Sequence, residues 1–259
     1  MKNCYSVLPL LLSLLAGSLA GCSKSSAPET AQPVSPPAPQ SAPSTIDKST
    51  LGGIVGTISF SGPAPKLPAL DFSADPACPA DPQPQDVVVI RGGKLANVLV
   101  YVKGGLGRTF PPPTEPVVLD QRGCRYVPHV LGVMVGQPLK VLNDDNAEHN
   151  VHPMPKNNQE WNESQMPRGQ PITKTFQHPE IMMPVKCNQH PWMQMYVNVM
   201  DNPFFAVSGD DGSFHINDLP PGDYTVAAVH EKFGEQTMKV TVAPKQTATV
   251  NFIFSAGPK

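Results

Sequence analysis

The sequence predicts an all-β protein, and three observations support that prediction. The chain of 259 residues contains 32 Pro and 20 Gly, which interrupt helices and favour turns and extended segments. Short apolar runs, several of them alternating with polar residues, recur between these turn residues. Nowhere do the apolar residues keep the spacing of an amphipathic helix. The length is compatible with one large domain or two small ones.

Most of the predicted strands lie in the first and last thirds of the chain. Residues 87–90 and 97–102 flank the turn sequence Arg91-Gly92-Gly93-Lys94 and are expected to form a hairpin. The complete set comprises residues 53–60, 87–90, 97–102, 212–216, 224–229, 237–242 and 247–254.

The charge balance excludes one class of function. The chain has 19 basic and 21 acidic side chains, a formal net charge of −2, and only 15% of its residues are charged. Lys and Arg form no stripe that would attract a nucleic acid. We therefore expect no nucleic-acid partner.

The N-terminus has the pattern of an export signal. Lys2 precedes an apolar run from Val7 to Ala20, which is too short to span a membrane as a helix. The run ends in Leu19-Ala20-Gly21-Cys22, which resembles the lipobox of bacterial lipoproteins. That resemblance implies that residues 1–22 form a lipoprotein signal, that Cys22 is acylated, and that the protein is anchored on the periplasmic side of a bacterial membrane. Ser23 favours the outer membrane by the usual sorting rule, and an ordinary signal peptide with a chance Cys is the alternative.

Residues 23–50 are expected to be a disordered linker. They consist mainly of Ser, Ala, Pro, Thr and Gln and have almost no large apolar side chain. Such a segment cannot bury enough surface to offset the entropy of ordering it. Its Pro content makes it a semi-extended spacer between the anchor and the folded part.

The strongest chemical signal is the sequence Cys187-Asn188-Gln189-His190-Pro191-Trp192-Met193. It places a thiolate, an imidazole and a thioether within seven residues, so that one loop can direct all three side chains at a single ion. A second imidazole is available upstream at His149. Two His and one Cys with a distant axial Met form the ligand set of a type 1, or blue, copper site.

These residues resemble the cupredoxins, and the Cys-His-Met loop is most similar to that of the amicyanins. His149-Asn150-Val151 matches the His-Asn-Val motif of the family, and Cys187 follows His149 after 38 positions. Residues 125–137 resemble the family's preceding strands. The resemblance implies one copper ion with equatorial ligands His149, Cys187 and His190 and axial ligand Met193. It further implies that Asn150 ties the two ligand loops together, that the ring edge of His190 is the exposed electron port, and that Pro191 and Trp192 form an apolar docking patch.

Several alternatives stand beside this interpretation. The Cys and His could bind zinc, could form a catalytic pair, or could be neighbours by chance. Met195 could replace Met193 as the axial ligand. His152 is three positions from His149, and in an extended segment it would point to the opposite face.

The cysteine count leaves an odd number in the folded part. Of 5 Cys, Cys4 leaves with the signal and Cys22 is assigned to the lipid. If Cys187 is a metal ligand, Cys78 and Cys124 remain for a disulfide, with two separate buried thiols as the alternative.

The run from Asp210 to Tyr224, with Leu219-Pro220-Pro221-Gly222 inside it, resembles the carboxypeptidase regulatory-like domains. These are transthyretin-like β-sandwiches, and the strand that matches their opening strand is 53–60, far upstream. We therefore expect one sandwich from residues 51–106 plus 204–259, with a cupredoxin Greek-key sandwich at 107–203 inserted in it. Two consecutive domains are the alternative.

Together these patterns predict a lipid-anchored electron-transfer protein and not an enzyme. The expected partner is a redox protein, which could be a cytochrome, an oxidase or another cupredoxin. A copper-holding or copper-delivery protein would use the same ligands. A surface binding module with a structural metal is the third hypothesis.

Overall fold

The computed structural model describes residues 46–257, and across this range the protein is all-β, as predicted. The single helical element of the described part is a 3-10 turn, η1 (Lys48–Thr50), at the end of the predicted linker. The lipoprotein signal, Cys22 and linker residues 23–45 lie outside the described residues. Within 46–257, no helix has the length and apolar character needed to cross a membrane.

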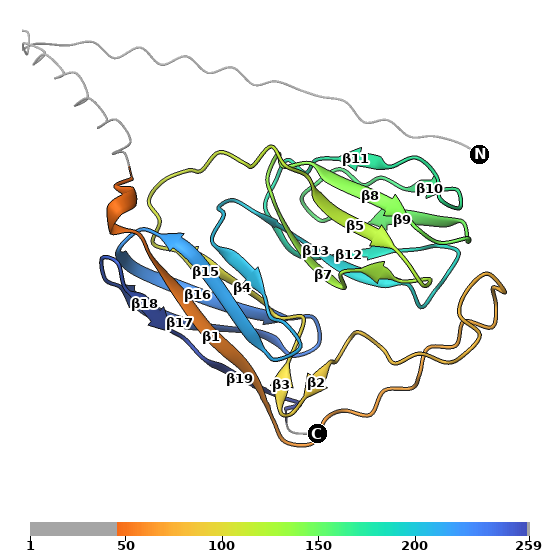
Figure 1. Cartoon of the computed structure of the whole chain (residues 1–259), viewed down its shortest axis with the longest axis horizontal. Coiled ribbons are helices and arrows are strands. Elements are labelled where there is room, and N and C mark those ends of the chain that lie inside the picture. The colour runs from red at the N-terminus through yellow and green to blue at the C-terminus, as the bar shows by residue number, and fades with distance from the viewer. Residues whose placement is uncertain (1–45, 258–259) are drawn as a thin grey trace, which may run out of the picture. The chain divides into compact units, whose positions relative to one another are not determined.

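Strands from both ends of the described range form one β-sandwich (Figure 1). Its first sheet has the order β15-β1-β3-β2, with β18 and β19 both paired in parallel to the long strand β1. Its second sheet has the order β14-β4-β16-β17. The strands are β1 (Gly52–Ser61), β2 (Ile90–Arg91), β3 (Lys94–Leu95), β4 (Leu99–Gly104), β14 (Phe205–Val207), β15 (Ser213–Leu219), β16 (Gly222–His230), β17 (Gly234–Val242), β18 (Thr247–Thr249) and β19 (Phe252–Ser255).

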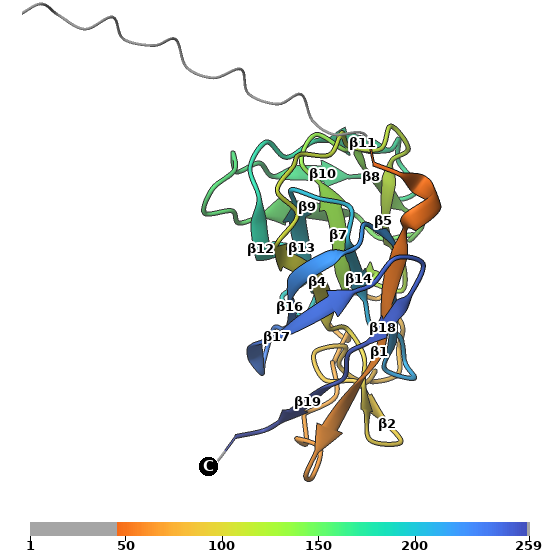
Figure 2. The same ribbon diagram turned by 90° about the vertical axis from the view of Figure 1, so that its left-hand side faces the viewer.

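Strands from the middle of the chain form a second pair of sheets, seen beside the first in Figures 1 and 2. One sheet has the order β10-β9-β12-β13-β7 and the other β11-β8-β5-β6. The strands are β5 (Val117–Gln121), β6 (Tyr126–Val127), β7 (Val130–Met134), β8 (Leu139–Asn143), β9 (His149–Pro153), β10 (Glu163–Gln165), β11 (Ile172–Lys174), β12 (Glu180–Lys186) and β13 (Gln194–Met200).

Sheet membership therefore changes twice along the chain. Residues 52–104 and 205–255 supply the first sandwich, and residues 117–200 supply the second. The domain ranges expected from the sequence, 51–106 plus 204–259 and 107–203, stay predictions.

The apolar residues form a core inside each sandwich and a third cluster between the two. The third cluster forms because the side chains of β4 are buried on both faces of the strand. Val100 and Val102 point into the core of the first sandwich, whereas Leu99 and Tyr101 join the third cluster. Met200 of β13 packs in that same cluster, so the second sheet of the first sandwich contacts the second sandwich directly.

Two predicted elements differ from the structure. The expected hairpin of 87–90 with 97–102 is limited to β2 and β3, which pair around Gly92 and Gly93, both with positive φ. Asn97, also at positive φ, redirects the chain into the other sheet, where β4 pairs with β14 and β16. The expected strand 247–254 is divided into β18 and β19.

A buried histidine of the first sandwich predicts a pH-dependent stability. His230 is 2% exposed, stacks on Phe233 with 4.6 Å between ring centroids, and accepts the Lys232 N–H at Nδ1. Its Nε2 has no hydrogen-bond partner among the described residues. Burial, together with the nearby charges of His129 and Lys232, lowers the pKa of His230 to about 4.

Between pH 6.5 and 4, the unfolded chain therefore binds a proton at His230 that the native state does not bind. The free energy of unfolding should fall across this window by up to about 3 kcal/mol from this residue. We expect His230→Phe to remove that part of the pH dependence, measured by urea denaturation at pH 7 and pH 4.5. Equal slopes in the variant and the parent would contradict this assignment.

Candidate metal centre

The ligand loop connects two antiparallel neighbours, β12 and β13. Cys187 follows the last residue of β12, and Met193 precedes the first residue of β13. The Cys187 N–H donates to the Met193 carbonyl (3.1 Å), and the Met193 N–H donates to the His190 carbonyl (2.9 Å). These two bonds close the loop and direct Cys187 and His190 to its inner side.

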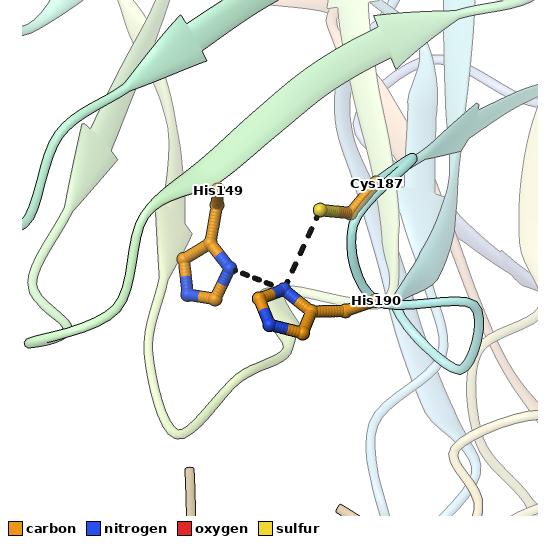
Figure 3. A group of neighbouring side chains, drawn as sticks. All are labelled: His149, Cys187 and His190. Atoms are coloured by element: carbon orange, nitrogen blue, oxygen red, sulfur yellow. Dashed lines mark hydrogen bonds between the residues drawn. The ribbon is translucent and has the colours of Figure 1, made fainter. Parts of the chain in front are cut away.

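The structure brings His149 to this loop. His149 begins β9, whose last residues pair antiparallel with the end of β12, so the start of β9 continues past β12 and lies beside the ligand loop. The Nδ1 atoms of His149 and His190 are 2.9 Å apart, and the Cys187 Sγ lies 3.6 Å from the His190 Nδ1 (Figure 3). The three potential ligand atoms lie within 4.8 Å of one another, and all three residues are buried.

Asn150 connects the two segments that carry these side chains. Its backbone N–H donates to the Cys187 Sγ (3.5 Å), and its Oδ1 accepts the Asn188 N–H (2.6 Å). The side chain is itself fixed, because its Nδ2 donates to Asn162 (2.6 Å). The spacing of His149 and Cys187 is therefore held by protein contacts alone.

The electrostatics of the site favour a thiolate. Burial alone would raise the pKa of Cys187, but the hydrogen bond with His149 and the backbone N–H groups around the sulfur lower it to about 6. Burial likewise opposes the charged form of His149, yet its bonds with Asp145 and Cys187 raise the pKa of its imidazole to about 9. The thiolate is the form of Cys that binds metals, and an ion bound at His149 displaces a proton.

Each His donates the N–H of its outer nitrogen to a carboxylate that was not predicted from the sequence. His149 Nε2 lies 2.9 Å from Asp145 Oδ2, and His190 Nε2 lies 2.9 Å from Asp75 Oδ2. Asp145 lies four residues before His149, so its closeness to that imidazole could have been inferred from the sequence. Asp75 lies 115 positions before His190, in a segment without any strand pattern.

The remaining predicted residues are placed as follows. Met193 and Met195 are both buried in the core of the second sandwich, with exposed fractions of 1% and 0%. His152 lies on the outward face of β9, where its ring contacts Asn188 (3.1 Å) and Glu160 (2.6 Å). Cys78 and Cys124 form a disulfide, and Cys187 is the free cysteine of the described residues.

The electron port predicted at His190 is wrong, whereas the docking patch of Pro191 and Trp192 stays a prediction. His190 is 3% exposed because Asp75 and its segment cover the ring edge that was expected to face solvent. Trp192 packs on Phe72, with 5.1 Å between ring centroids, and donates its indole N–H to the Cys124 carbonyl (3.1 Å). Pro191 alone of the predicted pair is freely exposed.

Comparison with known families gives one match. Residues 195–255 match the carboxypeptidase regulatory-like domain, which confirms that part of the expected fold. The matched range covers β14 to β19 and also β13 of the second sandwich. Comparison with the curated proteins gives no match.

Amicyanin variants, a purple cupredoxin and a copper-containing nitrite reductase are among the solved structures with similarity to this chain. A reduced amicyanin variant aligns at 23% identity and a TM-score of 0.30, over 39% of this chain and 98% of its own. A purple cupredoxin from Nitrosopumilus maritimus aligns at 22% identity and a TM-score of 0.28, over 32% of this chain and 99% of the cupredoxin. A copper-containing nitrite reductase from Thermus scotoductus SA-01 aligns at 21% and 0.32, over 37% of this chain and 24% of the reductase.

The donor set itself fits a soft or borderline metal ion. Metal bonds of about 2.0 Å to His nitrogen and about 2.3 Å to Cys sulfur place ligand atoms about 3–4 Å apart around one ion. The 3.6 Å between Cys187 Sγ and His190 Nδ1 is in this range, and the 2.9 Å between the two Nδ1 atoms is just below it. One thiolate with two imidazoles, both anchored at their outer nitrogens, is an N/S set that copper can use.

Proposed function

We propose that this protein is a copper-binding electron-transfer protein with one type 1 site, held by His149, Cys187 and His190 with Met193 as the axial ligand. The observation that supports it most is the convergence of one thiolate sulfur and two imidazole Nδ1 atoms in a buried cluster. Copper bound there would supply a centre that gains and loses one electron.

The protein's own residues supply the rigid frame that such a centre needs. Cys187 provides the thiolate, and the two His provide nitrogens whose outer atoms are fixed by Asp145 and Asp75. The loop bonds between Cys187, His190 and Met193 do not involve the ion. The ligand positions are therefore set before the metal binds, and little rearrangement has to accompany a change of charge.

Delivery of copper is less well supported by this geometry than electron transfer. All three ligand residues are buried, and His190 is covered by a segment of the other sandwich. A carrier that releases its ion readily would have to open this cover. An enzymatic role is not part of the proposal, because the side chains gathered at the site all serve as ligands or support them.

The proposal is tested by adding Cu(II) to the purified mature chain and recording a visible spectrum. We expect an intense thiolate-to-copper band that bleaches with a reductant and returns with an oxidant. A colourless protein that retains copper would contradict electron transfer through a type 1 site. Rapid loss of the ion to a mild chelator would favour copper delivery instead, and unfolding on removal of the metal would favour a structural ion.

We also propose that the chain works outside the cytoplasm, anchored by lipid on Cys22 to the periplasmic side of a bacterial membrane. The support for this is the sequence pattern of residues 1–22, and Ser23 favours the outer membrane. The proposed partner is a redox protein, either a cytochrome, an oxidase or another cupredoxin. A small and weak interface is normal for such an encounter.

The choice of axial ligand leads to a separate prediction. Met193 lies in the ligand loop, whereas Met195 lies within β13, opposite Val185 of β12. We expect Met193→Leu to leave copper bound and to shift the reduction potential, because an axial ligand tunes the potential. Met195→Leu is the matched control and should leave the potential unchanged. The reverse result would make Met195 the axial ligand.

A further inference from the structure

A segment of the first sandwich covers the metal centre of the second. Residues 62–89 connect β1 to β2 and run along the second sandwich, as the orange to yellow trace in Figure 1 shows. Phe72 of this segment packs on Trp192 of the ligand loop. Arg125, from the turn before β6, bonds Asp86 (2.7 Å) and lies over the Phe72 ring at 5.7 Å. The segment is thus fixed in place by contacts with the second sandwich.

The carboxylate of Asp75 is oriented by the backbone around it. Its Oδ1 accepts the Ala77 N–H (2.8 Å), which leaves Oδ2 for the His190 Nε2 at 2.9 Å. The Asp75 N–H donates to the Phe72 carbonyl, and the Asp75 carbonyl accepts the Cys78 N–H. The His190 side chain is 4% exposed and that of Asp75 is 29% exposed. This bond is therefore largely protected from competing water.

The disulfide links the segment of Asp75, which contacts His190, to a turn that bonds Asp145, which contacts His149. Cys78 lies three residues after Asp75, and its partner Cys124 donates its backbone N–H to Asp145 Oδ2 (2.8 Å). Asp145 Oδ2 is the atom that contacts His149. The disulfide and this hydrogen bond therefore link the two outer carboxylates, which contact the imidazoles at Nε2, away from the clustered Nδ1 atoms.

We propose that Asp75 is a positioning residue for His190, so that a side chain of the first sandwich completes the metal centre of the second. This inference rests on the proposed function for its copper readouts. A carboxylate on the outer nitrogen of a ligand His fixes the tautomer and orientation of the ring and increases its donor strength. Its negative charge also favours the more positive oxidation state of the ion.

The test compares Asp75→Asn and Asp75→Ala with Asp71→Ala in the copper-loaded full-length mature chain. Asp71 belongs to the same segment, but its carboxylate bonds the Ser73 N–H and does not contact His190. We expect both Asp75 variants to keep the visible band, to have a higher reduction potential, and to bind copper about 10–100-fold more weakly in competition with a chelator. The Asp71 variant should match the parent, and Asp75 variants that match it too would overturn the proposal.

A readout without metal separates this inference from the proposed function. In the metal-free parent, ¹⁵N NMR should show His190 protonated at Nε2, with slow exchange of that proton with water. Asp75→Ala should make this exchange fast, while Asp71→Ala should leave it slow. If the parent fails to form a copper band but shows this difference, the proposed function fails and the positioning role stands. Equal exchange in all chains would refute the role whether or not copper binds.

Discussion

Cys187→Ser should abolish the visible thiolate-to-copper band completely and reduce copper affinity by at least about 100-fold. The sulfur is the single thiolate among the three clustered ligands, and its neighbours lower its pKa to about 6. A serine hydroxyl remains protonated near neutral pH and provides a hard oxygen in place of a soft sulfur. The measurement is the visible spectrum of the Cu(II)-loaded variant, with bound copper determined by metal analysis.

His152→Asn is the matched control for the ligand set. This residue is on the same strand as His149, but its ring faces outward to Asn188 and Glu160. We expect this variant to keep the full band, whereas His149→Asn should lose it. Colour that persists in Cys187→Ser would refute the ligand assignment, and so would colour that disappears in His152→Asn.

Gly56→Ala should destabilise the first sandwich by about 3 kcal/mol, at the upper end of the usual cost of overpacking. A Cβ at this position of β1 would overlap the Val250 carbonyl oxygen and the ring of Phe214. The carbonyl oxygen is part of the backbone and cannot move away as a flexible side chain could. Relief would require β1 to separate from the Val250 region, where the Val250 N–H donates to Val55 (2.9 Å).

The control for this change is Gly104→Ala at the end of β4. A Cβ at Gly104 meets no atom within 4 Å, and its φ is not positive. We expect its unfolding free energy to stay within about 0.5 kcal/mol of the parent. Denaturation in urea measures both variants, and equal midpoints would show that β1 tolerates a side chain at this position.

The sequence was sufficient for elements whose signals are local. β1 was expected at 53–60 and spans 52–61, because the alternation of its side chains and the turn after it lie within the strand's own neighbourhood. The division between β18 and β19 was not predictable in this way, because neither Gly nor Pro interrupts residues 247–254. The break between β18 and β19 depends on the neighbouring strand β1, because the side chain of Asn251 accepts the Thr57 N–H of β1 (2.9 Å).

The same distinction between local signals and long-range contacts applies to the candidate site. Cys187, His190 and Met193 are one short motif, and His149 carries a motif of its own, so their pattern was visible in the sequence. Asp75 was not, because its relation to His190 depends on how segment 62–89 docks on the second sandwich. The same docking covers His190, which is why the expected electron port was wrong, and it places Phe72 against Trp192.

The disulfide has a consequence for the order in which the protein matures. The Cys78 Sγ lies within 4.8 Å of ligand atoms of His190 and Asp75, and the Cys124 Sγ lies equally close to those of His149 and Asp145. Reduced, these two sulfurs would be rival thiolates next to Cys187, and copper could be captured in a thiol-rich site of different chemistry. Oxidation of the pair would leave one sulfur for the proposed ion, so we expect the disulfide to form before copper binds.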